Sequence, residues 1–135
     1  MDYVSVMTAL ESLAASKPWN SQLRLTMDDR QFKEAEAVEA FVRHSVVFGA
    51  GDVISLGAEC FRYPGLQYLS IFYRGGKGNI LYWEEAQKIV RYYNPPRTVD
   101  NIVFQTAYAI KLPVDSKGFA QIQVVCPFYF DSRSQ

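Results

Sequence analysis

Few side chains in this sequence have the types and spacing that chemistry requires, and the only histidine, His44, is the first candidate. A catalytic imidazole works with a nearby nucleophile or carboxylate, and a metal site needs several ligands. His44 instead lies in an alternating run, on the same side as Val42 and Val46, with no cysteine, serine or aspartate spaced locally to work with it. We therefore interpret His44 as a structural side chain.

A glycine-rich run, Gly75-Gly76-Lys77-Gly78, stands between a predicted strand and a predicted helix, which is where phosphate-binding loops occur. The run matches neither Gly-x-x-x-x-Gly-Lys-Ser/Thr nor Gly-x-Gly-x-x-Gly, the two spacings that cradle phosphates. We interpret it as a flexible connection from strand to helix.

Acidic pairs are a third candidate, because two carboxylates that share a proton can act as acid and base. Asp28-Asp29 and Glu84-Glu85 are adjacent in the sequence. On an extended loop or a helix the side chains of adjacent residues diverge. Both pairs are therefore predicted to be solvated surface, and the sequence predicts no enzyme active site, no cofactor and no metal site.

Arginines beside aromatic residues, as in Phe61-Arg62-Tyr63 and Val90-Arg91-Tyr92-Tyr93, could stack on unpaired nucleic-acid bases. However, 14 basic residues are balanced by 14 acidic ones, and no RNP-like motif is present. Nucleic acids and membrane surfaces are normally met by a basic excess. The balanced charge argues against both partners, and it also weakens the repulsion between copies that opposes self-association.

The two cysteines, Cys60 and Cys126, each lie inside a run typical of a strand, where a small buried thiol is the preferred interpretation and a disulfide the alternative. The N-terminal residues have no basic segment followed by an apolar one, as a secretory signal would. No stretch approaches the ~18 apolar residues of a membrane span. We expect a protein that is used in a cytoplasm or leaves the cell by a route other than secretion.

The length of 135 residues, 49% of them hydrophobic and 15% aromatic, is typical of one folded domain over residues 1–135. Apolar residues at helical spacing predict an amphipathic helix over 2–16, with Asp2 as its N-cap. Residues 19–37 are interpreted as a loop that is dense in charge around 27–37, and a helix over Gln31 to Ala40 is the alternative.

Alternation of period two predicts a strand from Val38 to Phe48, and a second extended segment runs from Ala58 to Arg74. Pro64-Gly65 in that segment indicates a bend or an edge position. Helical spacing returns from Ile80 to Tyr93, with Asn79 as the expected N-cap. The predicted buried stripe is Ile80, Trp83, Ala86, Ile89, Val90 and Tyr93. The remaining predicted elements are the two strands of an antiparallel hairpin, 102–112 and 120–130.

This order predicts an α+β fold: a mostly antiparallel sheet of about four strands with two helices packed on one face. Aromatic residues are in excess on the extended segments and occupy both faces of them. Those residues are Tyr68, Phe72, Tyr73, Phe104, Tyr108, Phe119, Phe128, Tyr129 and Phe130. A sheet with helices on one side should present polar residues on the other, so the second apolar face is expected to meet another subunit.

Several short sequence motifs accompany this order of elements. They are Pro18-Trp19 after the first helix, Val53 to Gly57, Phe61-Arg62-Tyr63-Pro64-Gly65-Leu66 opening a strand that ends Ser70-Ile71-Phe72, and Gln123 to Phe128 near the C-terminus. Over nearly its whole length the chain resembles the tail terminator, or tail completion, proteins of long-tailed siphophages, including small phage-related proteins of unknown function with that fold. The Arg-x-Pro-Gly step before a long strand is the most specific of these motifs.

The resemblance implies a homo-hexameric ring that caps the tail tube, ends tube growth and forms the docking surface for the head-tail connector. It implies a virion protein of the tail, assembled in the cytoplasm of the bacterial host, with DNA passing through the channel without specific binding and no contact with a membrane. The charged loop would reach a neighbouring subunit, the tube or the connector. The interface candidates are Asp28, Asp29, Arg30, Lys33, Glu34 and Tyr108.

Two other functions remain open from the sequence. A small-molecule-binding or enzymatic α+β domain with an aromatic-lined pocket would explain the tyrosine and phenylalanine content equally well. Another head-to-tail connector component would differ from a terminator in its place in the virion.

Overall fold

The computed structural model describes residues 2–16, 19, 23–27, 40–53, 60–74, 80–94, 97–115 and 118–133. These residues form two helices and one eight-stranded sheet. The elements are α1 (Tyr3–Ala15), β1 (Arg24–Met27), β2 (Ala40–Phe48), β3 (Asp52–Val53), β4 (Cys60–Arg74), α2 (Ile80–Tyr93), β5 (Arg97–Val99), β6 (Ile102–Phe104), β7 (Tyr108–Leu112) and β8 (Phe119–Arg133).

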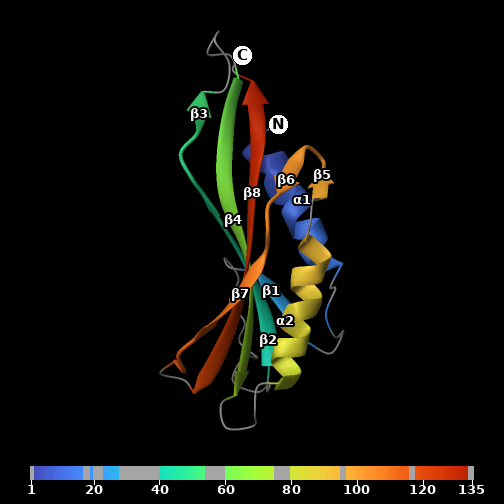
Figure 1. The fold of residues 1–135 in the computed structure, drawn as a ribbon, viewed down its shortest axis with the longest axis vertical. Coiled ribbons are helices and arrows are strands. Elements are labelled where there is room, and N and C mark those ends of the chain that lie inside the picture. The colour runs from blue at the N-terminus through green and yellow to red at the C-terminus, as the bar shows by residue number, and fades with distance from the viewer. Residues whose placement is uncertain are drawn as a thin grey trace.

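Two long antiparallel strands, β4 and β8, form the centre of the sheet and run the length of the molecule (Figure 1). The strand order is β1-β2-β4-β8-β6-β5, and β3 and β7 pair with the remaining edges of β4 and β8. The pair β1 and β2 is parallel, whereas the other pairs are antiparallel. The prediction of about four mostly antiparallel strands is therefore wrong, because the sheet is larger and mixed.

Short strands account for most of this difference. β1 lies within the segment interpreted as a loop, and β3, β5 and β6 have two or three residues each. Strands of four residues or fewer are too short to display a period of two, so they are identified by their pairing, which for β5 and β6 is with each other across a two-residue turn. The charged residues 28–36 and most of the alternative helix lie outside the described residues, but Ala40 begins β2.

The strand β4 passes through Pro64 and Gly65 without interruption and occupies a central position, contrary to the predicted bend or edge. Pro64 lies where the ladder with β2 ends, since that ladder finishes with Phe48 opposite Gly65. The Gly49 amide donates to the Pro64 carbonyl at 2.8 Å, and the ladder stops there because proline has no amide to donate in return. Gly65 is required by packing: a Cβ there would lie 2.3 Å from Cζ of Phe128.

The predicted strand over 102–112 is two strands, β6 and β7, because the chain contains a bulge between them. Phe104 lies opposite Phe128 and Tyr108 opposite Val125, so three residues on one side face two on β8. One extra residue reverses which side chains point to each face. Ile102 and Phe104 therefore share a face with Ala109, and Tyr108 points to the opposite face.

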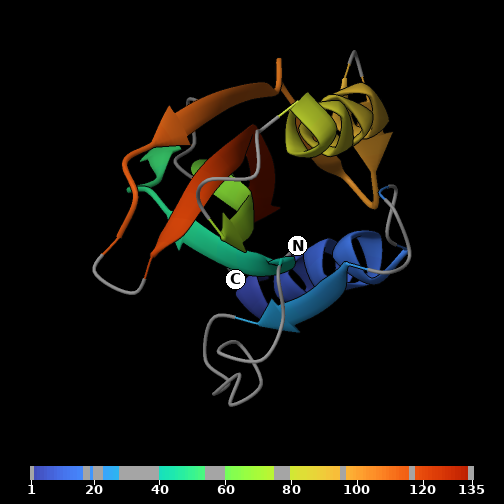
Figure 2. The ribbon, with the colours of Figure 1, turned by 90° about the horizontal axis from the view of Figure 1, so that it is seen from below.

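Both helices lie on one side of the sheet (Figure 2). As predicted, Asp2 caps α1: its carboxylate accepts a hydrogen bond from the Ser5 amide at 2.8 Å. We call the sheet face that the helices cover the inner face. Residues directly opposite each other in a ladder point to the same face, which places on the inner face Val42, His44, Gln67, Leu69, Ile71, Tyr73, Ile122, Val124, Cys126, Phe128 and Phe130.

The helix α2 is confirmed, as is the later part of its predicted stripe, but the first turn is not buried as predicted. Its buried residues are Glu85, Ala86, Ile89 and Tyr93, while Ile80 is 79% exposed and Trp83 37% exposed. Asn79 lies outside the described residues. Four consecutive apolar residues, 80–83, surround the first turn of the helix, so the sequence there does not determine which side faces the sheet.

The two cysteines are free thiols. Gln67 lies opposite Cys126 and Cys60 opposite Arg133, so the two cysteines are seven positions apart along the same ladder. At roughly 3.3 Å per residue this distance far exceeds what a disulfide spans.

None of the helices that the structure describes is long and apolar enough to cross a membrane.

Candidate functional site

The surface of the sheet that faces away from the helices, here called the outer face, is the first candidate site. No described helix covers it (Figure 2). The register places there a set of apolar side chains, most of them partly exposed: Phe41, Val47, Leu66, Tyr68, Phe72, Val103, Tyr108, Ile110, Phe119, Val125 and Tyr129. The prediction of apolar residues on both faces is thus confirmed, and one of the two faces has no helix over it.

Tyr108 is the one predicted interface residue that the structure describes, and it is 48% exposed on the outer face. Ile110, two residues further along β7, is also exposed. The other predicted interface residues lie outside the described residues. They are Asp28, Asp29, Arg30, Lys33 and Glu34.

An aromatic cluster with arginines stacked on it occupies the end of the outer face where β2, β4 and β8 meet. The rings of Phe41 and Phe72 stack at 5.0 Å, and Phe119 meets Phe41 edge to face at 5.5 Å. The Arg43 guanidinium lies over Phe72 at 5.3 Å, and that of Arg74 lies over Phe119 at 4.2 Å. These contacts bury much of the aromatic surface and leave positive charge at the rim of the cluster.

At the other end of the outer face, Arg62 forms a two-point ion pair with Asp131, with Nε–Oδ1 and Nη2–Oδ2 distances of 2.8 and 3.1 Å. The hydrogen bonds from Arg62 hold the pKa of Asp131 below its ordinary value, and those to Asp131 raise the pKa of Arg62. Arg62 also lies over the ring of Tyr129 at 4.2 Å. This arginine is therefore engaged within the chain and does not present a free stacking surface to a base.

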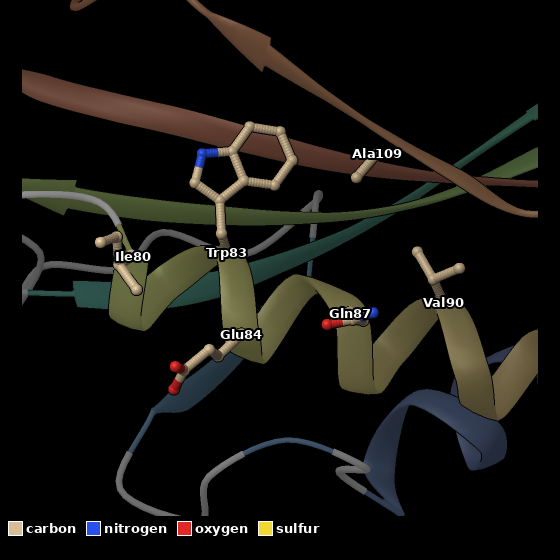
Figure 3. Close-up of a pocket in the computed structure, with 6 residues that line it drawn as sticks. All are labelled: Ile80, Trp83, Glu84, Gln87, Val90 and Ala109. Atoms are coloured by element: carbon tan, nitrogen blue, oxygen red, sulfur yellow. The ribbon is translucent and has the colours of Figure 1, made fainter.

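A groove between α2 and β7 is the second candidate. It has a volume of about 490 Å³ and is lined by Ile80, Trp83, Glu84, Gln87, Val90 and Ala109. Trp83 and Val90 project from α2 toward the strand that carries Ala109 (Figure 3). The sequence interpretation missed this groove because it assigned Ile80 and Trp83 to the core; the run of four apolar residues at the start of α2 is the signal that could have indicated it.

One of the two glutamates on α2 departs from the predicted solvated surface. Glu85 is 4% exposed, and Lys88 Nζ lies 2.9 Å from its Oε1. Glu84 is exposed at the groove, and none of the described residues forms a hydrogen bond or an ion pair with its carboxylate. The two adjacent carboxylates diverge, as expected, and form no acid-base pair.

His44 belongs to the inner face. It is 2% exposed, and its Nε2 lies 3.0 Å from Gln67 Nε2, which also donates to the backbone oxygen of Leu10 on α1 at 3.1 Å. An amide nitrogen is a donor only, so His44 Nε2 accepts this hydrogen bond. The network connects the sheet to α1 and supports the structural interpretation of His44.

Within the part of the chain that the structure describes, no three His, Cys, Asp or Glu side chains are grouped so that they could hold a metal ion. In the first of two smaller pockets, lined by Thr98, Asn101, Val103 and Asp131, the carboxylate is already paired with Arg62. The second, beside Pro64 and Pro127, has no titratable side chain in its lining. The outer face and the groove both present exposed apolar side chains that a partner could contact. A comparison with models of known protein families finds no match, and a search of curated proteins finds none either.

Proposed function

We propose that this protein is a structural assembly protein of a long-tailed phage, which caps the tail tube as a homo-hexameric ring, ends tube growth and forms the docking surface for the head-tail connector. The proposal joins the resemblance of the sequence to tail terminators with the surface of the fold. Its mechanism is the burial of apolar surface between subunits, and it requires no catalytic step.

The observation that carries the proposal is the outer face. An apolar face without a helix over it is costly in contact with water, at roughly 25 cal/mol per Å² of apolar surface. A neighbouring subunit removes that cost, and a closed ring gives every copy the same neighbour. Val47 on β2 and Tyr108 and Ile110 on β7 are exposed on this face and would be buried by such a contact.

The proposed partners are further copies of this chain, the tail tube protein and the head-tail connector protein, and the proposed location is the virion tail after assembly in the host cytoplasm. DNA would pass through the channel without specific binding, and no membrane is involved. The overall charge is balanced at 14 basic and 14 acidic residues, so a ring of these chains carries no large basic excess to hold the DNA as it slides.

The test combines the chain with the tail tube protein of the same phage and follows tube polymerisation by electron microscopy. We expect shorter tubes that carry a ring at one end. Light scattering that shows a monomer, together with tubes of unchanged length and no ring in micrographs, would refute the proposal.

A Tyr108→Glu variant sharpens this test, because it places a charge on the outer face. We expect it to abolish capping while the circular dichroism spectrum remains that of a folded chain. Ser12→Glu, which adds the same charge to the exposed side of α1, is the matched control and should cap normally. Equal capping by both variants would show that Tyr108 is not at the interface.

A second candidate, a small-molecule-binding domain, is favoured by the apolar groove between α2 and β7, whose volume is within the range of ligand pockets. It predicts a monomer whose Trp83 fluorescence changes on titration with an apolar ligand. A ring that forms without any ligand argues against this candidate.

A further inference from the structure

The two apolar surfaces of this chain differ in charge, and the difference is complementary. The outer face around β2 carries Arg43 at its aromatic cluster, whereas the α2–β7 groove carries Glu84. The surfaces also differ in shape, because one is a sheet face and the other a groove with Trp83 along it (Figure 3). The outer face around β2 therefore offers a positive charge, and the groove offers a negative charge.

Arg43 is positioned as if its ion-pair partner came from outside the described chain. Its guanidinium lies 5.3 Å from the ring of Phe72 and 6.0 Å from that of Phe41, and its Nε is buried without an acceptor among the described residues. A buried donor that has lost its water and gained no acceptor destabilises the fold. Arg43 as a whole is partly exposed, so a carboxylate from a docked partner could pair with the charge of its guanidinium.

The groove shows the corresponding features on α2. Ile80 and Trp83 expose apolar surface there, although the same helix buries Glu85 against the sheet. The helix α2 thus has an apolar side that the rest of the described chain leaves exposed to water. Such an exposed apolar surface is typical of a site of contact with a partner. Glu84 lies beside that apolar surface, and none of the described side chains pairs with it.

We propose that the outer face around Arg43 of one copy docks on the α2–β7 groove of a second copy, with Arg43 paired to Glu84. This inference rests on the proposed hexameric ring and names its subunit contact. A contact between two different surfaces is heterologous, and when the rotation it imposes closes, it builds a ring. The occupant of the groove is therefore another copy of this chain.

Charge disfavours a contact between two like surfaces. A contact that joined two outer faces or two grooves would leave Arg43 and Glu84 without the opposite charge that the other surface offers. Like charges brought together at an interface cost affinity, whereas the head-to-tail arrangement brings opposite charges together. The same pairing specifies the register of neighbouring subunits in the ring.

The test is a charge swap followed by sedimentation equilibrium of the full chain. Arg43→Glu and Glu84→Arg should each weaken self-association about tenfold or more, and the double variant should recover to within about threefold of the original affinity. Arg91→Glu and Glu11→Arg reverse exposed charges outside the groove lining and the outer face, and they should leave the affinity unchanged. Circular dichroism confirms that each variant is folded.

If Arg43→Glu fails to fold, Arg43→Gln and Glu84→Gln keep the test open, because each removes one charge at nearly constant volume. The two single variants should then weaken association equally, and combining them should add little. The inference fails if association is unaffected by the single reversals, or if the swap does not recover it while each variant is folded.

The inference and the proposed function can fail separately. A ring that caps tubes but is insensitive to the charge reversals leaves the function standing and overturns the contact. A chain that stays monomeric up to about 1 mM, while its Trp83 emission shifts on addition of tail tube protein, assigns the groove to the tube and overturns the second copy as occupant. Self-association that obeys the charge swap without any effect on tube length retains the contact and overturns the function.

Discussion

The two faces of the central strands differ in what covers them, although alternate residues of the same strands form both faces. Along β4, Leu69 and Ile71 point to the inner face and have no exposed surface, whereas Tyr68 and Phe72, their immediate neighbours, point to the outer face and are partly exposed. The inner face is completed by helices of the same chain. Apolar character alone therefore does not define a core. A side chain is buried, and stabilises the fold, only where another element of the chain covers it.

The largest difference should appear when these neighbouring residues are truncated. Ile71→Ala removes packing from a fully enclosed site and should lower the free energy of unfolding by about 2–5 kcal/mol. Phe72→Ala removes a larger side chain but one that water already reaches, so it should cost about 1–2 kcal/mol. Urea unfolding of the dilute monomer measures both. Equal costs would show that the outer face belongs to the core.

A smaller effect should follow from adding one methyl group to the inner face. Gly65→Ala places a Cβ against the ring of Phe128, and overpacking of this kind should cost about 1–3 kcal/mol. Repeating the change in a Phe128→Leu background should cost less, because the clashing ring is gone. A double-mutant cycle by urea unfolding measures the coupling; additive costs would contradict the close approach.

The reactivity of the two thiols should differ, because Cys126 lies in the interior of the sheet and Cys60 lies at its end. Burial raises the pKa of the Cys126 thiol, so Cys126 should react with a thiol reagent only as the chain unfolds. Cys60 is partly exposed at the start of β4 and should react in the native state. Cys60→Ser and Cys126→Ser assign the two rates. Rapid native-state labelling of Cys126 would contradict its position on the inner face.

The smallest effect concerns the outer-face ion pair. Because Arg62 lowers the pKa of Asp131 below the ordinary 3.8, the pair contributes stability that is present above about pH 4 and is lost as the pH falls further. Both side chains are substantially exposed, so salt should weaken the effect. Asp131→Asn should flatten the acid limb of a pH profile of unfolding. An unchanged limb would mean that the pair adds nothing.

A good part of the fold was predictable from the sequence because the pattern was long enough to be decisive. The helices 3–15 and 80–93 and the two faces of β2 and β4 follow from spacing over nine or more residues. The short strands, the parallel pair and the continuity of β4 through Pro64 were not predictable. Each depends on which strand it pairs with, and for β1 and β4 that partner lies many residues away, so no local pattern encodes it.

The candidate site divides in the same way. The apolar excess on both sides of the strands was visible in the sequence. Tyr108, named there as an interface candidate, is 48% exposed on the outer face, and its role at an interface stays a prediction. The groove was not visible, because the apolar residues 80–83 encircle the helix and only packing against the sheet determines its rotation. Burial of Glu85 and exposure of Ile80 follow from that rotation.

The sequence by itself determined which residues share a side within each long helix and strand, since backbone geometry repeats every 3.6 or 2 residues wherever the element is regular. The tertiary structure alone decided which side is covered, where β1 pairs, and that the bulge between Phe104 and Tyr108 turns Tyr108 outward. The physical reason is the sequence separation over which the two kinds of interaction act. Periodicity is a local property of the backbone, whereas register and coverage result from contacts between segments tens of residues apart.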